Sequence, residues 1–166
     1  RRFGAAASKK TRPLVTSGQQ GLVLVTRRLE NAMGNITVTA LSEHVGADVI
    51  GVDLRKPLSD AEFAIILDAF HRYSVVRLRE TGAHDADVVA LSARFGRNKI
   101  HDLFDYLDGA HPELMRVSNI EENGKPIGLK DSAVLWHSDM AYRADPNPIS
   151  VLVAEEITSW GGGTRF

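Results

Sequence analysis

Residues 57–79 constrain the fold most, because a helix start, an amphipathic helix and a strand follow one another there without a gap. Ser59 is a favourable N-cap residue, and Glu62 three positions later completes a capping box. Apolar side chains then recur at helical spacing and form one stripe, which consists of Phe63, Ile66, Leu67 and Phe70. The run SVVRLR at 74–79 indicates a buried strand. This arrangement favours a sheet with helices packed against it.

Other segments fit the same architecture. ITVTAL at 36–41 alternates apolar and polar residues, and ADVIGVDL at 47–54 indicates a second strand. Asp85 is a candidate N-cap for a second helix over residues 86–95. Two later strands are predicted over residues 114–120 and 149–157. This order predicts an α+β domain and lacks the regular alternation of a doubly wound sheet.

The first 34 residues differ in charge from the rest of the chain. They hold 7 of the 20 basic residues and only one of the 21 acidic residues. Three interpretations stay open: a basic arm for nucleic acid or an anionic surface, a transit peptide, or upstream sequence outside the fold with Met33 as the true start. We favour the third, because recognisable domain sequence begins directly afterwards at NITVTAL. We therefore expect a disordered or non-native extension over residues 1–34 and a domain over residues 35–166.

Composition excludes several classes of protein. The chain has no cysteine, so it has no disulfide, thiolate metal site or cysteine nucleophile. That is compatible with a reducing compartment, and we expect a cytoplasmic protein. No apolar run approaches the roughly 18–20 residues of a membrane span. The hydrophobic content of 43% and charged content of 25% are typical of one globular domain.

The sequence LWHSDMAY contains the pattern with the most specific chemistry. On an extended segment His137 and Asp139 point to the same face, so an imidazole nitrogen and a carboxylate oxygen can bind one metal ion. A second histidine from elsewhere would complete the 2-His-1-carboxylate triad of non-haem Fe(II) oxygenases. Alone the pattern is weak, because about one such match is expected by chance in this composition. His111-Pro112-Glu113 is a second match, and an ordinary polar turn is the alternative for both.

The context of the two matches separates them. Trp136 precedes His137, Tyr142 follows Asp139, and then come a proline turn, an apolar strand and the sequence GGGT. This order resembles the taurine / 2,4-dichlorophenoxyacetate dioxygenase family (TauD/TfdA), whose pattern is W-H-[ST]-D, an aromatic residue, proline, a strand and G-G-D-T.

The resemblance extends upstream of the metal pattern. The block over residues 46–80, with its PLSD, resembles the family's N-terminal block, and ARFG at 93–96 resembles the end of the family's next helix. VSNIEENGK at 117–125 is more similar to the phenoxyacetate branch than to the taurine branch. Several motifs in the same order, over residues 36–166, make the resemblance specific.

The resemblance implies a fold and a chemistry. The implied fold is a double-stranded β-helix, a clavaminate synthase-like jelly roll flanked by helices, which is truncated here at its C-terminus. The implied cofactors are Fe(II), 2-oxoglutarate as cosubstrate and O₂. The implied reaction hydroxylates a small anionic organic substrate while 2-oxoglutarate is converted to succinate and CO₂.

Particular residues match the family's functional positions. His137 and Asp139 match two iron ligands, and Thr164 matches a threonine that hydrogen-bonds a carboxylate of 2-oxoglutarate. In GGGT, Gly163 replaces the family's acidic residue. The third ligand and an arginine that pairs with 2-oxoglutarate are expected downstream of Phe166, so we expect this chain to be a fragment.

Four residues are candidates for substrate binding. His101 matches a histidine that contacts substrate in taurine-type members, with a plain loop histidine as the alternative. Phe104 stands where those members have a tyrosine, and Ala133 stands where they have an asparagine, which argues against taurine as the substrate. Trp136 and Tyr142 are candidates for the pocket wall.

Two further hypotheses stay beside the dioxygenase. The first is a truncated, inactive family member or an interaction module with an incomplete metal site. The second is a nucleic-acid binder that uses the basic arm, which is disfavoured because the rest of the chain is acidic. The expected partner is a small-molecule substrate, with no nucleic acid and no membrane, and the full-length protein is expected to be a homo-oligomer.

Overall fold

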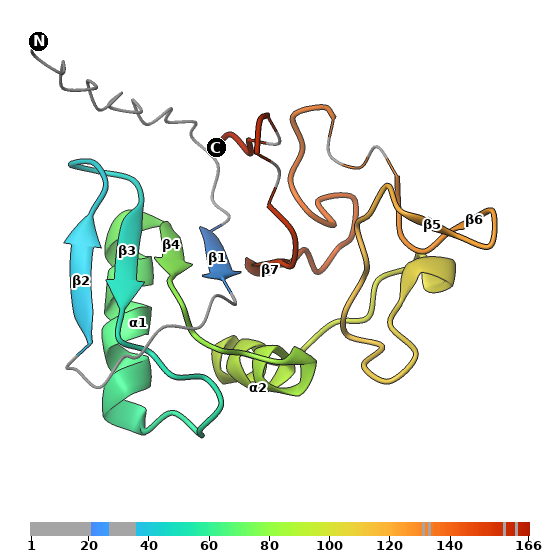
Figure 1. The fold of residues 1–166 in the computed structure, drawn as a ribbon. Coiled ribbons are helices and arrows are strands. Elements are labelled where there is room, and N and C mark those ends of the chain that lie inside the picture. Colours follow the sequence, from blue (N-terminus) through green and yellow to red (C-terminus); the bar gives the residue numbers. More distant parts are fainter. Residues whose placement is uncertain (1–20, 27–35, 131, 133, 158, 162) are drawn as a thin grey trace, which may run out of the picture.

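A computed structural model describes residues 21–26, 36–130, 132, 134–157, 159–161 and 163–166. Its centre is a five-stranded sheet in the order β2-β3-β4-β1-β7, shown in Figure 1. The strands span Gly21–Thr26 (β1), Thr37–Ala40 (β2), Ala47–Ile50 (β3), Val75–Leu78 (β4) and Ile149–Ala154 (β7). β2 is antiparallel to β3, and the other neighbouring strands are parallel. Together with its helices the sheet makes a mixed α+β fold, as predicted.

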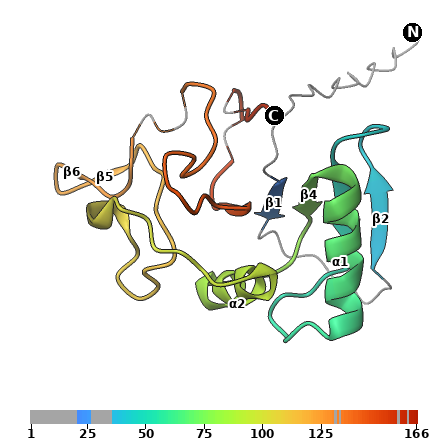
Figure 2. The same cartoon turned by 180° about the vertical axis from the view of Figure 1, so that it is seen from behind.

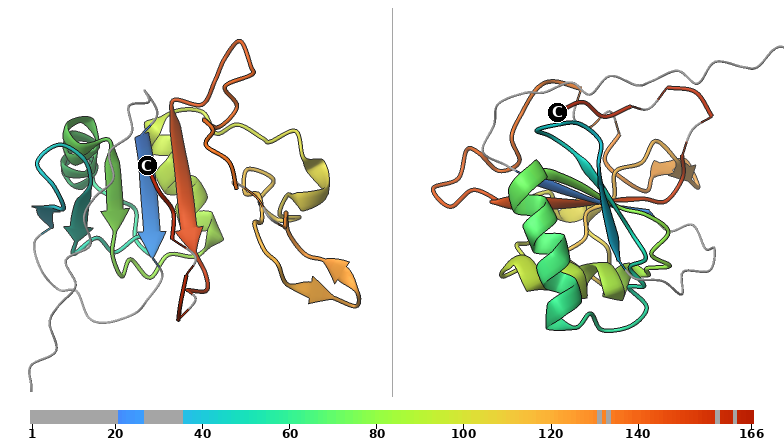
Figure 3. Two further views of the ribbon diagram at one scale, coloured as in Figure 1. Left: turned by 90° about the horizontal axis from the view of Figure 1, so that it is seen from above. Right: turned by 90° about the vertical axis from the view of Figure 1, so that its left-hand side faces the viewer.

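Two helices cover one face of this sheet. They are α1 (Asp60–Tyr73) and α2 (Asp85–Phe95), and Figures 2 and 3 show both on the same side. The buried core joins sheet and helices through Val49, Val76, Leu78, Phe63, Ile66, Phe70, Val88 and Leu91. Within the described ranges, neither helix has the length and apolar composition that crossing a bilayer requires.

The start of α1 follows the predicted capping box. The Ser59 backbone N–H donates to Glu62 Oε2 at 2.8 Å, and the Glu62 N–H donates to Ser59 Oγ at 3.2 Å. Each side chain satisfies a backbone donor that the first turn of a helix leaves without a partner. The start of α2 differs by one residue from the prediction, because His84 is the N-cap and Asp87 accepts its N–H at 2.8 Å.

Strand β1 is a finding that the sequence did not predict. Residues 21–26 fall inside the segment that was expected to lie outside the fold, yet they pair with β4 on one side and β7 on the other. Residue Val23 of this strand is fully buried. The expectation is therefore wrong for these six residues, whereas residues 1–20 and 27–35 lie outside the described residues.

The chain between α2 and β7 is mostly loop, and Figures 1 and 3 draw it beyond the β7 edge of the sheet. It contains a short 3₁₀ helix and a small hairpin, namely Phe104–Tyr106 (η1), Glu121–Glu122 (β5) and Lys125–Pro126 (β6). The strand predicted over residues 114–120 is wrong. That segment makes two isolated bridges, Leu107 with Met115 and Val117 with Leu129, so it forms no continuous ladder.

The sheet face away from the helices carries polar groups. Because side chains alternate along a strand, Asp48 and Arg77 point away from the core that Val49 and Val76 build. Arg77 Nε donates to Asp48 Oδ1 at 2.6 Å, and Nη2 donates to Oδ2 at 2.8 Å. This two-pronged hydrogen bond raises the pKa of Arg77 further above its ordinary value. The same alternation places Ser150 of β7 on this polar face.

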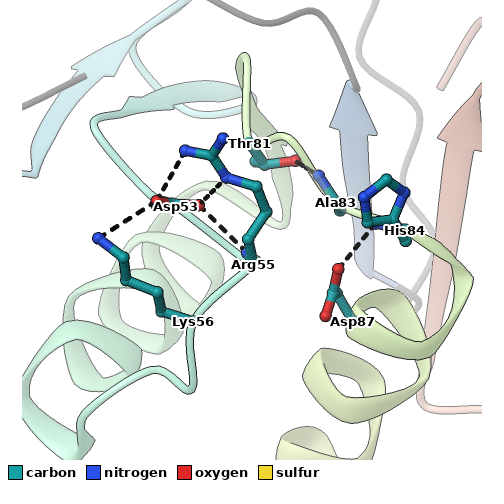
Figure 4. A network of polar contacts seen from close by, with 7 residues as sticks. All are labelled: Asp53, Arg55, Lys56, Thr81, Ala83, His84 and Asp87. Atoms are coloured by element: carbon teal, nitrogen blue, oxygen red, sulfur yellow. Dashed lines mark hydrogen bonds and ion pairs between the residues drawn. The ribbon is translucent and has the colours of Figure 1, made fainter. Parts of the chain in front are cut away.

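The loop after β3 and the loop before α2 each carry polar contacts, which Figure 4 shows side by side. The Leu54 backbone N–H, which donates to the Thr81 backbone oxygen at 3.0 Å, joins the two loops. Asp53 accepts from Arg55 Nε at 2.7 Å and lies 3.6 Å from Lys56 Nζ. The Arg55 hydrogen bond lowers the pKa of Asp53 to about 2. Because the Arg55 side chain is 52% exposed, the pair adds little to stability. Its effect is to hold the stem of Arg55 against the neighbouring turn at Gly82.

Gly82 is a position where an added methyl group should be costly. Its φ is +65°, and an added Cβ would lie 3.0 Å from Arg55 Cδ. Gly82→Ala is expected to lower the free energy of unfolding by about 1–2 kcal/mol, the cost of a left-handed non-glycine residue. Urea unfolding measures the change. Gly109→Ala is the control, because its Cβ would meet nothing within 4 Å, and a similar loss there would contradict the explanation.

Candidate metal centre

The His137 ring is oriented by its own loop, which leads into β7. His137 Nδ1 lies 2.8 Å from the backbone oxygen of Leu135. A carbonyl oxygen only accepts, so Nδ1 carries the proton in this contact. In the neutral ring, Nε2 is then left with a free lone pair. That is the arrangement in which a histidine binds a metal through Nε2 while a carbonyl fixes its tautomer.

The Asp139 carboxylate meets the other side of the His137 ring. Asp139 Oδ1 lies 3.3 Å from His137 Nε2, and Oδ2 accepts a hydrogen bond from Ser150 Oγ. Two ligands that sit about 2.1 Å from one metal ion and roughly at right angles lie about 3 Å apart. The separation and the nitrogen and oxygen donors therefore fit two adjacent ligands of Fe(II). A protonated His137 in an ion pair with Asp139 would give a similar distance.

The pair is accessible and incomplete. The side chains of His137 and Asp139 are 49% and 44% exposed. In the part of the chain that the structure describes, no group of three or more His, Cys, Asp or Glu side chains could hold a metal ion. The described residues thus offer two convergent donors and leave the rest of a coordination sphere to other groups.

The second His-x-acid match is arranged differently. Across the described residues no ion pair joins His111 to Glu113. The His111 backbone N–H, rather than its ring, is engaged, and it donates to Asp108 Oδ1 at 2.9 Å. That bond is the largest cause of the lowered pKa of Asp108. The two matches therefore differ in the contacts that their side chains make.

Two residues of the loop after α2, Lys99 and Asp102, bind the loop after Asp139. Lys99 Nζ donates to the backbone oxygens of Asp145 at 2.7 Å and Pro146 at 3.0 Å. Asp102 accepts from Tyr142 Oη at 3.0 Å and from Arg143 Nη1 at 3.1 Å. The Asp102 hydrogen bond raises the pKa of Tyr142. The loop that bears the candidate ligands is thereby fixed to the loop that follows α2.

A cavity of about 270 Å³ opens at this junction. Its lining is rich in cationic side chains and consists of Arg97, Asn98, Lys99, Ile100, Arg143 and Asp145. Part of the positive charge is neutralised, since Lys99 pairs with Asp145 at 2.8 Å and Arg143 pairs with Asp102. Arg97 leaves the lining with a net positive charge.

The four predicted substrate residues have different environments. His101 is half-buried, and its Nδ1 accepts the Leu103 N–H at 3.1 Å. Phe104 is 71% exposed, and Trp136 is 69% exposed. Tyr142 is 72% exposed and is held through its hydroxyl by Asp102. Of the four, Trp136 and Tyr142 lie on the same loop as His137 and Asp139. Asp102, which directly follows His101, binds Tyr142, so His101 is held near that loop.

Thr164 is not brought to the metal pair. It is exposed, and no hydrogen bond between Thr164 and His137 or Asp139 occurs among the residues described. Its role as a 2-oxoglutarate contact therefore stays a prediction, as do the ligand roles of His137 and Asp139.

Three contributors were missed by sequence analysis: Lys99, Asp102 and Ser150. The partners of Lys99 and Asp102 lie 40 residues or more away in the sequence, and no local sequence pattern reveals such pairs. For Ser150, in contrast, the sequence does contain a signal. It is the polar residue between Ile149 and Val151, both of which pack against the core, so alternation alone puts its hydroxyl on the open face.

Comparison with known proteins gives concordant matches. The profile of the "Taurine catabolism dioxygenase TauD, TfdA family" matches residues 37–166. Pentalenolactone F synthase of Streptomyces arenae is 32% identical over 125 residues, which are 72% of this chain and 40% of that protein. The chain therefore spans well under half the length of this curated relative.

Two solved structures are also similar. A taurine dioxygenase from Burkholderia xenovorans shares 42% identity over 46% of this chain and 28% of its own, with a TM-score of 0.42. AAD-2, crystallised with Mn(II) and N-oxalylglycine, shares 25% identity over 67% of this chain and 34% of its own, with a TM-score of 0.44. The family profile is the broadest of these matches, and because it runs from the start of β2 to the last residue, the chain belongs to the TauD/TfdA dioxygenase family.

Proposed function

We propose that the protein containing this chain is a non-haem Fe(II)- and 2-oxoglutarate-dependent dioxygenase that hydroxylates a small anionic organic substrate. Members of the family depend on Fe(II) and 2-oxoglutarate. The observation that carries the proposal for this chain is the approach of His137 Nε2 to Asp139 Oδ1 at 3.3 Å. The whole protein would have the jelly-roll core of the family.

The chemistry would be divided between the cofactors and the chain. Bound Fe(II) would supply O₂ activation, in which one oxygen atom enters succinate as 2-oxoglutarate loses CO₂ and the other enters a C–H bond of the substrate as a hydroxyl group. His137 and Asp139 would bind the metal ion through Nε2 and Oδ1. The Leu135 carbonyl would keep the His137 proton on Nδ1. Thr164 would donate its hydroxyl to a carboxylate of 2-oxoglutarate.

The proposed substrate class rests on the positive charge of the cavity lining and on the absence of a tyrosine hydroxyl at Phe104. The cavity beside the ligand loop is lined by Arg97, Lys99 and Arg143, which favour an anionic molecule. His101, Phe104, Trp136 and Tyr142 would form the walls of the substrate site. Phe104 offers no hydrogen bond, so the substrate should present an apolar group there, which disfavours taurine.

The alternative is a chain without catalytic activity, that is, a truncated or inactive member or an interaction module. The observation that favours it is the incomplete donor set, because the described residues hold only two convergent donors. Under this hypothesis metal binding is weak and substrate is not turned over.

Turnover of 2-oxoglutarate tests the proposal. The full-length protein and the 166-residue chain are each supplied with Fe(II), 2-oxoglutarate, O₂ and a panel of sulfonates, sulfate esters and aryloxy acids. Substrate-dependent succinate formation by the full-length protein alone is the expected result. No succinate from either protein, with any member of the panel, favours the alternative. Robust turnover by the 166-residue chain would show that the donors described here suffice.

A further inference from the structure

The contact between Ser150 and Asp139 links the candidate ligand loop to the sheet. Ser150 is the second residue of β7, which pairs with β1 along its whole length from Ile149 to Ala154. Its Oγ donates to Asp139 Oδ2 across 11 residues of sequence. The His137 ring, in contrast, is oriented by Leu135, a residue of its own loop. Ser150 therefore couples the carboxylate to a regular element.

The contact also distinguishes the two carboxylate oxygens. With Oδ2 engaged by the Ser150 hydroxyl, Oδ1 is the oxygen that faces His137 Nε2. A carboxylate can bind a metal ion through one oxygen or both, and a hydrogen bond to one oxygen favours the one-oxygen mode. One-oxygen binding leaves one more coordination position for other ligands.

We propose that Ser150 is a positioning residue for the metal site, which holds Asp139 Oδ2 so that the carboxylate binds the metal through Oδ1 alone. This inference rests on the proposed function. The competing explanation is that the contact only attaches a loop to a strand. The two differ in what happens at the metal, because a loop attachment would affect folding stability and leave the metal coordination unchanged.

Mn(II) binding to the full-length protein tests the proposal without any turnover. Free Mn(II) is titrated by its EPR signal in the wild type and in Ser150→Ala and Ser150→Thr. Ser150→Ala is expected to weaken binding about 10- to 100-fold, the usual effect of removing a partner of a metal ligand. Ser150→Thr keeps the hydroxyl and suits a strand, so it should bind within about 3-fold of the wild type. The spectrum of bound Mn(II) should change in Ser150→Ala and not in Ser150→Thr.

Ser42→Ala is the matched control. Ser42 Oγ donates to the Val45 backbone oxygen at 2.6 Å in the β2–β3 turn, at the opposite edge of the sheet from β7. Ser42 Oγ also accepts the Val45 backbone N–H at 3.0 Å, so Ser42→Ala loses two hydrogen bonds. It should nevertheless bind Mn(II) as the wild type does. Thermal unfolding of all the variants separates a folding defect from a change in affinity.

The outcomes are distinct. Wild-type affinity and spectrum in Ser150→Ala overturn the inference alone, and so does equal weakening in Ser150→Ala and Ser150→Thr, since the hydroxyl would then not matter. A wild-type protein whose Mn(II) binding does not depend on His137 overturns the proposed function and the inference with it. Weak binding in Ser150→Ala, restored in Ser150→Thr, supports the inference.

Discussion

His137→Ala and Asp139→Ala are each expected to weaken Fe(II) or Mn(II) binding by at least about 100-fold in the full-length protein, because loss of a ligand costs more than the roughly 10- to 100-fold that loss of a ligand's partner costs. Substrate-dependent succinate formation should fall below detection in both variants. Asp139→Asn sharpens the test, since it keeps the shape of the side chain and removes its charge. Anaerobic Fe(II) titration and Mn(II) EPR measure the affinities.

The chain supplies its own control for this experiment. His111→Ala with Glu113→Ala removes a His-x-acid pair of identical spacing from a loop where no ion pair joins the two described side chains. Metal affinity should be unchanged in that variant. The main hydrogen bonds of this loop are kept, because Asp108 accepts backbone N–H groups of Ala110 and His111. An equal loss of metal affinity in the His111/Glu113 variant and in the His137 and Asp139 variants would contradict the proposed metal centre. Unchanged affinity in the His137 and Asp139 variants would also contradict it.

The parts of the fold that the sequence predicted are those with a local cause. The capping box of Ser59 and Glu62 lies within one turn and forms as expected. Strands β3 and β4 follow from short apolar runs, although β3 ends at Ile50, four residues before the predicted limit. Gly51, with φ +91°, turns the chain there, since only glycine adopts that conformation without strain.

The predictions that failed concern segments whose structure depends on partners distant in sequence. GLVLVT at 21–26 is a short apolar run inside a basic segment, and its charge context outweighed its strand-like composition. Its neighbours in the sheet, β4 and β7, are about 50 and 130 residues away in sequence, so no window of local pattern contains them. The prediction for residues 114–120 was wrong in the opposite sense. A strand was expected there, but these residues form only isolated bridges to other segments.

For the candidate site, too, the sequence predicted the local properties and not those that depend on other parts of the structure. Spacing was enough to place His137 and Asp139 on one side of their segment, and the structure brings their donor atoms within 3.3 Å. Spacing could not show which ring nitrogen is free or which carboxylate oxygen is held. Those properties depend on the Leu135 carbonyl and the Ser150 hydroxyl, which are contacts of three-dimensional structure.

The second large effect is expected in the core beneath the sheet. Ile66 in α1 is fully buried and belongs to the cluster that joins α1 to Val76 and Leu78 of β4. Ile66→Ala removes three carbon atoms and leaves a cavity that neighbours in a close-packed core fill only in part. The free energy of unfolding should fall by about 2–5 kcal/mol.

The adjacent residue provides a control of the same type in the same helix turn. Ile65 is 38% exposed, so Ile65→Ala loses less buried area and leaves no closed cavity. Its cost should stay below about 1 kcal/mol. Urea unfolding of the full-length variants, with unchanged dependence on urea concentration, measures both values. Because both substitutions replace isoleucine with alanine in α1, helix propensity cancels and the difference reports burial alone. Equal losses at the two positions would mean that α1 does not pack against β3 and β4 through the Ile66 face.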